Sequence, residues 1–237
     1  SLSKHSAGMA VRFVTDATTI KAKWKLTSAN IAMNHMAATG VSGLDLYVKT
    51  ETGKWRWLAV GKPSKQENNE TLISGLIPGK REYMLYLPLY NGVESVEIGV
   101  PEASHLWKAP PREAGKDKPL VFWGTSITQG GCASRTGMVH TAILGRRLDL
   151  PVINLGFSGN GRMEPEVAKL VAELDASVFI MDCLPNVTAE TVARETEPLV
   201  KTLRAAHPET PILLVEDRTY SNAYLKKSSQ DRHRTSR

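Results

Sequence analysis

The chain has 237 residues, 41% hydrophobic and 23% charged, which is typical of a globular protein with room for one large or two small domains. No apolar run approaches the roughly 18–20 residues of a membrane span. The net charge of +6 comes mostly from a basic tail, because the last twelve residues hold five basic side chains and one acidic one. Without a basic patch with interleaved aromatics, the charge does not favour nucleic-acid binding. The first residues contain no apolar leader, but the chain does not begin with Met, so a removed leader stays open.

The first half of the chain is rich in short β-type stretches separated by turn signals. They are Ala10–Val14, Thr19–Leu26, Gly43–Val48, Trp55–Val60, Thr71–Ile73, Glu82–Leu87 and Ser95–Val100. Many short strands at regular spacing predict an all-β jelly roll or sandwich. The dipeptide Asn91-Gly92 predicts a hairpin between the last two strands. Trp24, Trp55 and Trp57 lie within predicted strands, at positions typical of side chains in a sandwich core. A sugar-stacking surface is the alternative interpretation.

Residues 109–118 are rich in proline and charge and show no periodicity. We therefore predict a linker there, between a β domain of residues 1–108 and a second domain of residues 119–237.

The second half alternates strands and helices. The predicted strands are Leu120–Trp123, Pro151–Leu155, Val178–Cys183 and Ile212–Glu216, and the predicted helices lie near residues 136–148, 165–174 and 189–206. Thr188 is the expected N-cap of the last helix. This alternation predicts a parallel, doubly wound sheet. After Tyr220 the pattern stops, before a fifth strand and a closing helix, so we expect the domain to be incomplete at its C-terminal end.

Three loops after successive strands offer groups that acyl transfer needs. Ser126 follows the first strand and is the candidate nucleophile. Gly159 lies in a glycine-rich loop that can point N–H groups at a ligand, and Asn186 follows the third strand. Ligands of open α/β sheets bind at this carboxyl edge. Together these groups can form an oxyanion hole. A phosphate cradle at residues 158–161 is the competing interpretation, but neither Walker nor Rossmann spacing supports it.

The segments Gly124-Thr-Ser-Ile-Thr128, Asn154-Leu-Gly-Phe-Ser-Gly159 and Leu184-Pro-Asn186 resemble the first three blocks of the SGNH (GDSL-type) hydrolases, with Thr125 in place of the usual Asp. The resemblance implies a flavodoxin-like α/β fold for residues 119–237 and a serine esterase. It also implies Ser126 as the nucleophile, with Ser126, Gly159 and Asn186 as the oxyanion hole.

The first half is similar to the jelly-roll domain that precedes the catalytic domain in some members of the family. Several of those members resemble carbohydrate deacetylases. The implied substrate is thus a short acyl ester, such as an acetyl ester, on a small molecule or a carbohydrate. A secreted or periplasmic location would fit such a substrate. The resemblance implies no cofactor, and no metal-ligand spacing of Cys or His occurs in the sequence.

The family's fourth block, Asp-x-x-His, is not found. The six histidines are His5, His35, His105, His140, His207 and His233. Only His105 has an acid three residues earlier, and it precedes the nucleophile. His140 and His233 are the remaining candidates for a base. Because a serine without a base is a weak nucleophile, activity of this chain is doubtful, and a non-catalytic carbohydrate-binding protein with a degenerate hydrolase domain is the alternative.

Other polar residues near the predicted loops have two interpretations each. Glu216-Asp217-Arg218 could line the pocket or form a solvated ion-pair cluster. Arg162 and Glu164 could contact substrate or anchor the glycine loop. Cys132 and Cys183 are expected to be two reduced, buried thiols, with one disulfide near the site as the alternative.

Overall fold

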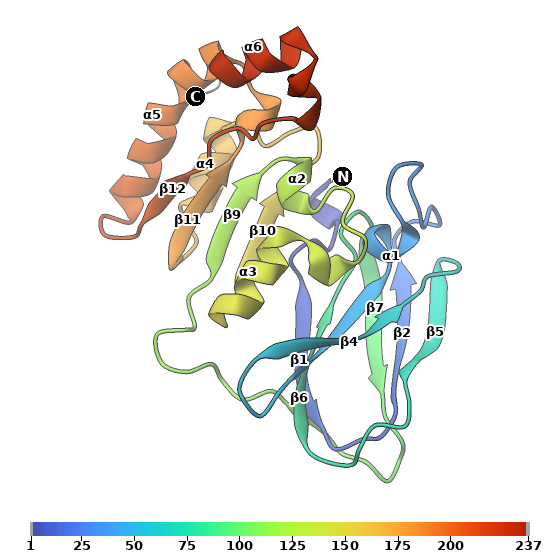
Figure 1. Cartoon of the computed structure of the whole chain (residues 1–237). Coiled ribbons are helices and arrows are strands. Elements are labelled where there is room, and N and C mark those ends of the chain that lie inside the picture. Colours follow the sequence, from blue (N-terminus) through green and yellow to red (C-terminus); the bar gives the residue numbers. More distant parts are fainter. Residues whose placement is uncertain (1, 236–237) are drawn as a thin grey trace.

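The computed structural model describes the backbone of residues 2–235 and the side chains of residues 2–232. An antiparallel β half precedes a half built on a parallel sheet, and the two halves pack against each other (Figure 1). The predicted fold class, a flavodoxin-like α/β sheet preceded by a β sandwich, is confirmed.

The β half contains two antiparallel sheets. The larger has the order β4-β3-β6-β1-β8 and the smaller the order β5-β2-β7. The strands are β1 (Ala10–Thr15), β2 (Ile20–Leu26), β3 (Leu44–Lys49), β4 (Trp55–Gly61), β5 (Glu67–Ile73), β6 (Arg81–Tyr86), β7 (Val93–Gly99) and β8 (Leu106–Lys108). Two short helical segments, η1 (Leu2–Lys4) and α1 (Ala38–Val41), complete this half.

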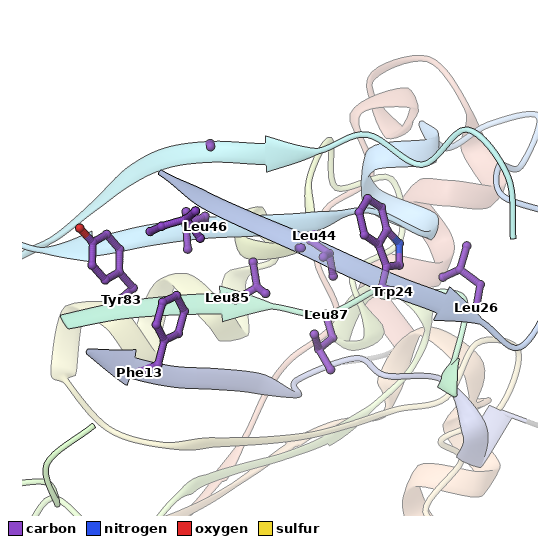
Figure 2. Close-up of a cluster of buried hydrophobic side chains, with 11 residues drawn as sticks. Phe13, Trp24, Leu26, Leu44, Leu46, Tyr83, Leu85 and Leu87 are labelled. Carbon is purple, nitrogen blue, oxygen red and sulfur yellow. The ribbon is translucent and has the colours of Figure 1, made fainter. Parts of the chain in front are cut away.

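Apolar side chains from both sheets form one core. Figure 2 shows Phe13, Leu46 and Leu85 of the larger sheet beside Trp24 and Leu26 of the smaller one. Alternation along β2 puts Trp24 in this core, where it is fully buried and donates its indole N–H to the Ser42 carbonyl at 3.2 Å. Trp24 is therefore a core residue and not part of a sugar-stacking surface.

The predicted hairpin at Asn91-Gly92 is wrong, because β6 and β7 belong to different sheets. Asn91 is buried, and its amide donates to the Ser28 carbonyl and the Ser42 hydroxyl at 3.0 and 3.1 Å. A Cβ on Gly92 would lie 2.2 Å from the Lys4 carbonyl oxygen. This dipeptide is thus a tightly packed crossover between sheets, where tertiary contacts override the local turn preference.

The second half has four parallel strands in the order β10-β9-β11-β12. The strands are β9 (Leu120–Gly124), β10 (Val152–Gly156), β11 (Val178–Asp182) and β12 (Ile212–Leu214). The helical segments that connect them are α2 (Ser126–Gln129), η2 (Thr136–Met138), α3 (His140–Leu148), α4 (Pro165–Val171), η3 (Leu184–Asn186) and α5 (Ala189–Ala206). The predicted cap of α5 is confirmed, since the Thr188 hydroxyl accepts the Thr191 N–H at 3.2 Å.

Side chains of β9 alternate between the two faces of this sheet. Val121 and Trp123 pack with residues of α4 and α5, whereas Leu120 and Phe122 belong to a separate cluster on the opposite face. A parallel sheet needs cover on both faces, which explains why β9 is apolar at every position.

The chain continues as a helix where the sequence pattern had stopped. After β12 come η4 (Ser221–Tyr224) and α6 (Lys227–Thr235). Helix α6 has no apolar stripe, which is why periodicity did not reveal it. Its Lys227 and Asp231, four residues apart, form an ion pair at 2.6 Å. Arg232 donates to the Pro185 carbonyl and to the Asp217 carboxylate, so this helix lies against the loop that carries Asn186.

Candidate active site

Ser126 is the first residue of α2, and only Thr125 separates it from the end of β9. Thr125 is buried and caps this short helix, because its hydroxyl accepts the Ile127 N–H at 3.4 Å. A Cβ on Gly124 would lie 2.1 Å from the Thr128 hydroxyl oxygen. Only glycine therefore lets the chain turn this tightly from the strand into the helix that carries the serine.

The glycine-rich loop after β10 packs against this turn. A Cβ on Gly156 would meet the Gln129 nitrogen at 1.9 Å, and one on Gly161 would meet the Gly124 carbonyl oxygen at 2.0 Å. Gly159 has a positive φ of +74° with open space around its Cα. The loop thus keeps a backbone segment accessible beside the Ser126 turn.

Arg162 and Glu164 anchor the glycine loop. Arg162 donates from Nη2 to the Gly159 carbonyl at 2.8 Å, and the Glu164 carboxylate accepts the Arg162 backbone N–H at 2.7 Å. Of the two interpretations for this pair, these contacts favour anchoring.

Asn186 reaches the glycine loop from the neighbouring strand. It ends the η3 turn after β11, and its Nδ2 donates to the Asn160 carbonyl at 2.7 Å. Strand register places Gly156 and Asp182 on either side of Gly124. Ser126, Gly159 and Asn186 therefore follow the carboxyl ends of three adjacent strands.

Gln129, which the sequence did not single out, holds these loops together. Its side chain is buried, its Oε1 accepts the Ser158 N–H at 2.9 Å, and its Nε2 donates to the Leu89 carbonyl at 3.0 Å. The same Nε2 lies 2.9 Å from Nδ1 of His5. No short-range pattern marks a glutamine three residues after a serine, because its partners come from distant segments.

Tyr90 brings the β half to the candidate nucleophile. Its hydroxyl donates to the Ser126 carbonyl at 2.9 Å. Burial raises the pKa of Tyr90, while hydrogen bonding with the Ser158 and Ser126 side chains opposes that shift. The phenol is therefore neutral at physiological pH and acts as a hydrogen-bonding group in the wall of the site.

A buried carboxylate lies under the site. Asp182 ends β11 and accepts from the Thr128 hydroxyl at 2.8 Å, while Arg218 lies 3.4 Å from its other oxygen. Burial raises the pKa of Asp182, and the Thr128 hydrogen bond and the Arg218 charge oppose this. Asp217 pairs with Arg232 at 3.3 Å. Residues 217 and 218 thus take part in an ion-pair network.

None of the described histidine side chains has a recorded contact with Ser126. His140 packs edge-on against Phe122 with ring centroids 5.9 Å apart, and burial lowers its pKa. His105 pairs with Asp16 at 3.2 Å, in the β half. His233, the remaining candidate base, has a side chain outside the described residues.

The two cysteines are not bonded to each other. Cys183 is fully buried, its Sγ lies 3.6 Å from the Trp123 carbonyl oxygen, and burial raises its pKa to about 12. The expectation that both thiols are buried is wrong for Cys132, which is exposed on a left-handed turn with φ of 64°. Among the described residues, no three His, Cys, Asp or Glu side chains cluster as metal ligands would.

The β half and the second half also meet at Asp45, which is fully buried. Its carboxylate accepts the Gly137 N–H at 3.0 Å, the Trp57 indole N–H at 2.8 Å and the Arg135 Nε–H at 3.3 Å. Gly137 and Arg135 belong to the segment between α2 and α3. Asp45 therefore fixes the chain that follows the candidate nucleophile onto the sandwich.

Comparison with known proteins places this arrangement in a family. A model described as the GDSL-like lipase/acylhydrolase family matches residues 117–237. The chain belongs to this family. A second model, of the N-terminus of SGNH-hydrolase-type esterases, is named for the motif GxDLY and matches residues 1–106. Residues 43–47 of this chain read Gly-Leu-Asp-Leu-Tyr, so the motif contains Asp45.

Solved structures with both halves resemble the chain. A candidate GDSL-like lipase from Bacteroides ovatus ATCC 8483 is 37% identical over 99% of this chain and 68% of its own, with a TM-score of 0.92. A family two carbohydrate esterase from Clostridium thermocellum in complex with cellohexaose is 16% identical, covering 95% of this chain and 76% of its own (TM-score 0.65). An acetyl xylan esterase from Butyrivibrio proteoclasticus is 10% identical, covering 94% and 77% (TM-score 0.60). These last two share the fold. No curated protein matches the chain.

Among the described residues, no helix is both long enough and apolar enough to cross a bilayer.

Proposed function

We propose that Ser126 is the nucleophile of an ester hydrolase and that the N–H groups of Ser126 and Gly159 and the amide of Asn186 bind the oxyanion. The observation that carries the proposal is the meeting of their three loops at one edge of the parallel sheet, where Asn186 donates to Asn160 at 2.7 Å. That bond uses one N–H of the Asn186 amide and leaves the second for a ligand. Removing one such donor from known oxyanion holes slows catalysis about 10²–10³-fold.

The proposed substrate is a short acyl ester, such as an acetyl ester, carried by a carbohydrate. The support is the family membership together with the shared two-part fold of carbohydrate esterases. In this assignment residues 1–108 form the β domain, residues 109–118 the linker and residues 119–237 the hydrolase domain. The chemistry proposed for Ser126 requires neither a metal nor a cofactor.

In the proposed reaction the Ser126 oxygen bonds to the acyl carbon and its hydroxyl proton passes to water, while the carbonyl oxygen becomes the oxyanion. Collapse then breaks the bond from the acyl carbon to the sugar oxygen, and the sugar leaves as the alcohol after its oxygen takes up a proton from water. Water then releases the acyl group as the acid. Because the sequence lacks the Asp-x-x-His block that would supply a base, we propose that turnover by this chain is slow and rests mainly on the oxyanion hole and substrate binding.

The test measures hydrolysis of p-nitrophenyl acetate and labelling by a fluorophosphonate, with Ser126→Ala compared with Ser134→Ala. Ser134 is an exposed serine a few residues away, and the structure records a contact only for its carbonyl. We expect slow hydrolysis and labelling that Ser126→Ala abolishes and Ser134→Ala leaves unchanged. Labelling that survives Ser126→Ala would refute the assignment. Carbohydrate binding without any turnover or labelling would support the non-catalytic alternative.

A further inference from the structure

A cavity lies between the two halves, and the proposed nucleophile is not part of its lining. Its volume is about 730 Å³, which is in the range of small-ligand sites, and it is lined by residues of β3, β4 and α3 and of the segments beside them. Ser126, Gly159 and Asn186 do not line it. A ligand held there would therefore contact other residues than those proposed for the ester chemistry.

The cavity is strongly basic. Its lining includes six basic side chains, Lys49, Lys54, Lys116, Arg135, Arg146 and Arg147, and two acidic ones, Glu113 and Asp149. Both acids are already paired, Asp149 with Lys49 and Glu113 with Lys116, each at 3.0 Å. Within the described part of the chain, the structure records no ion pair for Lys54, Arg146 or Arg147. The cavity thus carries positive charge that the protein itself does not neutralise.

Arg146 is the most enclosed of these three cations. Its guanidinium lies 3.9 Å from the Tyr47 ring centroid and 5.2 Å from that of Tyr86. Its Nη1 is buried and has no hydrogen-bond partner among the described residues. A partly buried cation without a counter-charge is costly, so an anion in the cavity would stabilise this arrangement.

An exposed indole stands beside these cations. Trp57 lines the cavity with 49% of its surface exposed, and its indole N–H is bonded to Asp45 at 2.8 Å, which fixes the ring. The Arg135 guanidinium lies 4.9 Å from the ring centroid. A rigid, amphipathic aromatic surface next to arginines suits a ligand with both an apolar ring face and a negative group.

We propose that this cavity is an accessory binding site for an acidic oligosaccharide. A sugar ring packs on Trp57, and its carboxylate or sulfate is bound by Lys54, Arg146 and Arg147. The observations favour a sugar over a nucleic acid because the unpaired cations gather in one cavity of small-ligand size and do not form an extended stripe. The site would hold the protein on an acidic glycan while the ester site acts on its own substrate.

The experiment measures binding of the full chain by calorimetry at low and moderate salt. The probes are oligogalacturonate for the carboxylate, a chondroitin sulfate oligosaccharide for the sulfate, neutral xylo-oligosaccharide and a short DNA duplex. The variants are Lys54→Glu and Arg147→Glu, both at exposed positions, with Lys21→Glu as the matched charge reversal on β2. Ser126→Ala tests independence from the ester site.

We expect one or both acidic oligosaccharides to bind, the neutral one not to bind, and the two cavity variants to bind at least about tenfold more weakly. Lys21→Glu and Ser126→Ala should bind like the unchanged chain. Equal weakening by Lys21→Glu, or DNA binding as tight as glycan binding, would show a general charge effect and overturn the proposal. Absence of binding to both acidic probes would also overturn it. Loss of binding in Ser126→Ala would indicate that the ligand binds at the ester site, and it would likewise overturn the proposal.

Discussion

Replacing Asp45 by alanine should loosen the contact between the two halves of the molecule. The change removes the acceptor for four donors, on Gly137, Tyr47, Trp57 and Arg135. The Gly137 N–H is buried and would lose its recorded partner. Trp57 and Arg135 are partly exposed and can regain water.

The expected cost in the free energy of unfolding is about 3 kcal/mol. Removing one partner of a buried ion pair costs about 3–5 kcal/mol, and the exposure of Arg135 places this case at the lower end. A single unsatisfied buried N–H contributes about 1–3 kcal/mol of that. Such a loss is a large part of the roughly 5–15 kcal/mol that stabilises a typical protein.

Urea unfolding followed by tryptophan fluorescence measures this cost at pH 7. Asp117→Ala, at an exposed carboxylate, is the control and should change stability by less than about 0.5 kcal/mol. A loss below about 1 kcal/mol in Asp45→Ala would refute the argument that this carboxylate fastens the two halves.

The Asp45 carboxylate also makes the stability of the fold depend on pH. Burial is the largest influence on Asp45 and raises its pKa above the usual 3.8, while the charge of Arg135 and the hydrogen bond from Trp57 oppose the shift. The folded chain therefore binds this proton more tightly than the unfolded chain. Its contribution to stability is fully present below pH 3.8 and is lost as the pH rises through the folded-state pKa. The stability of the unchanged chain relative to Asp45→Asn should fall over that interval, and a rise would contradict the assignment.

Gln129→Ala should lower the free energy of unfolding by about 2–4 kcal/mol, because the Ser158 N–H and the Leu89 carbonyl both lose their recorded side-chain partner. Urea unfolding measures this loss. The same variant should weaken phosphonate labelling of Ser126 in the folded protein, and unchanged labelling would show that Gln129 does not position the loops. An aromatic disulfide reagent at pH 8 should modify one thiol, Cys132, in the folded chain and a second only on unfolding, because burial raises the pKa of Cys183 to about 12. Rapid modification of both would contradict this burial.

Local features of the fold could be predicted from the sequence because their causes are local. The helix at residues 189–206 follows from its periodicity and from Thr188, and the observed bounds agree. The parallel sheet follows from the alternation of elements. The prediction of a hairpin at Asn91-Gly92 was wrong because the hydrogen-bond partners of the Asn91 side chain lie 49 and 63 residues away in the sequence. Helix α6 was missed because its residues are polar throughout and its position depends on Arg232 contacting distant segments.

The sequence by itself determined the two-part architecture, the family resemblance and the three loops with Ser126, Gly159 and Asn186, since each depends on residues adjacent in the chain. Only the tertiary structure revealed what holds those loops together. Gln129, Tyr90 and Asp45 act through hydrogen bonds that span as many as 124 residues of sequence. Such contacts leave no periodic signal, because the energy of a buried hydrogen bond depends on where its partner lies in space and not on where it lies in the chain.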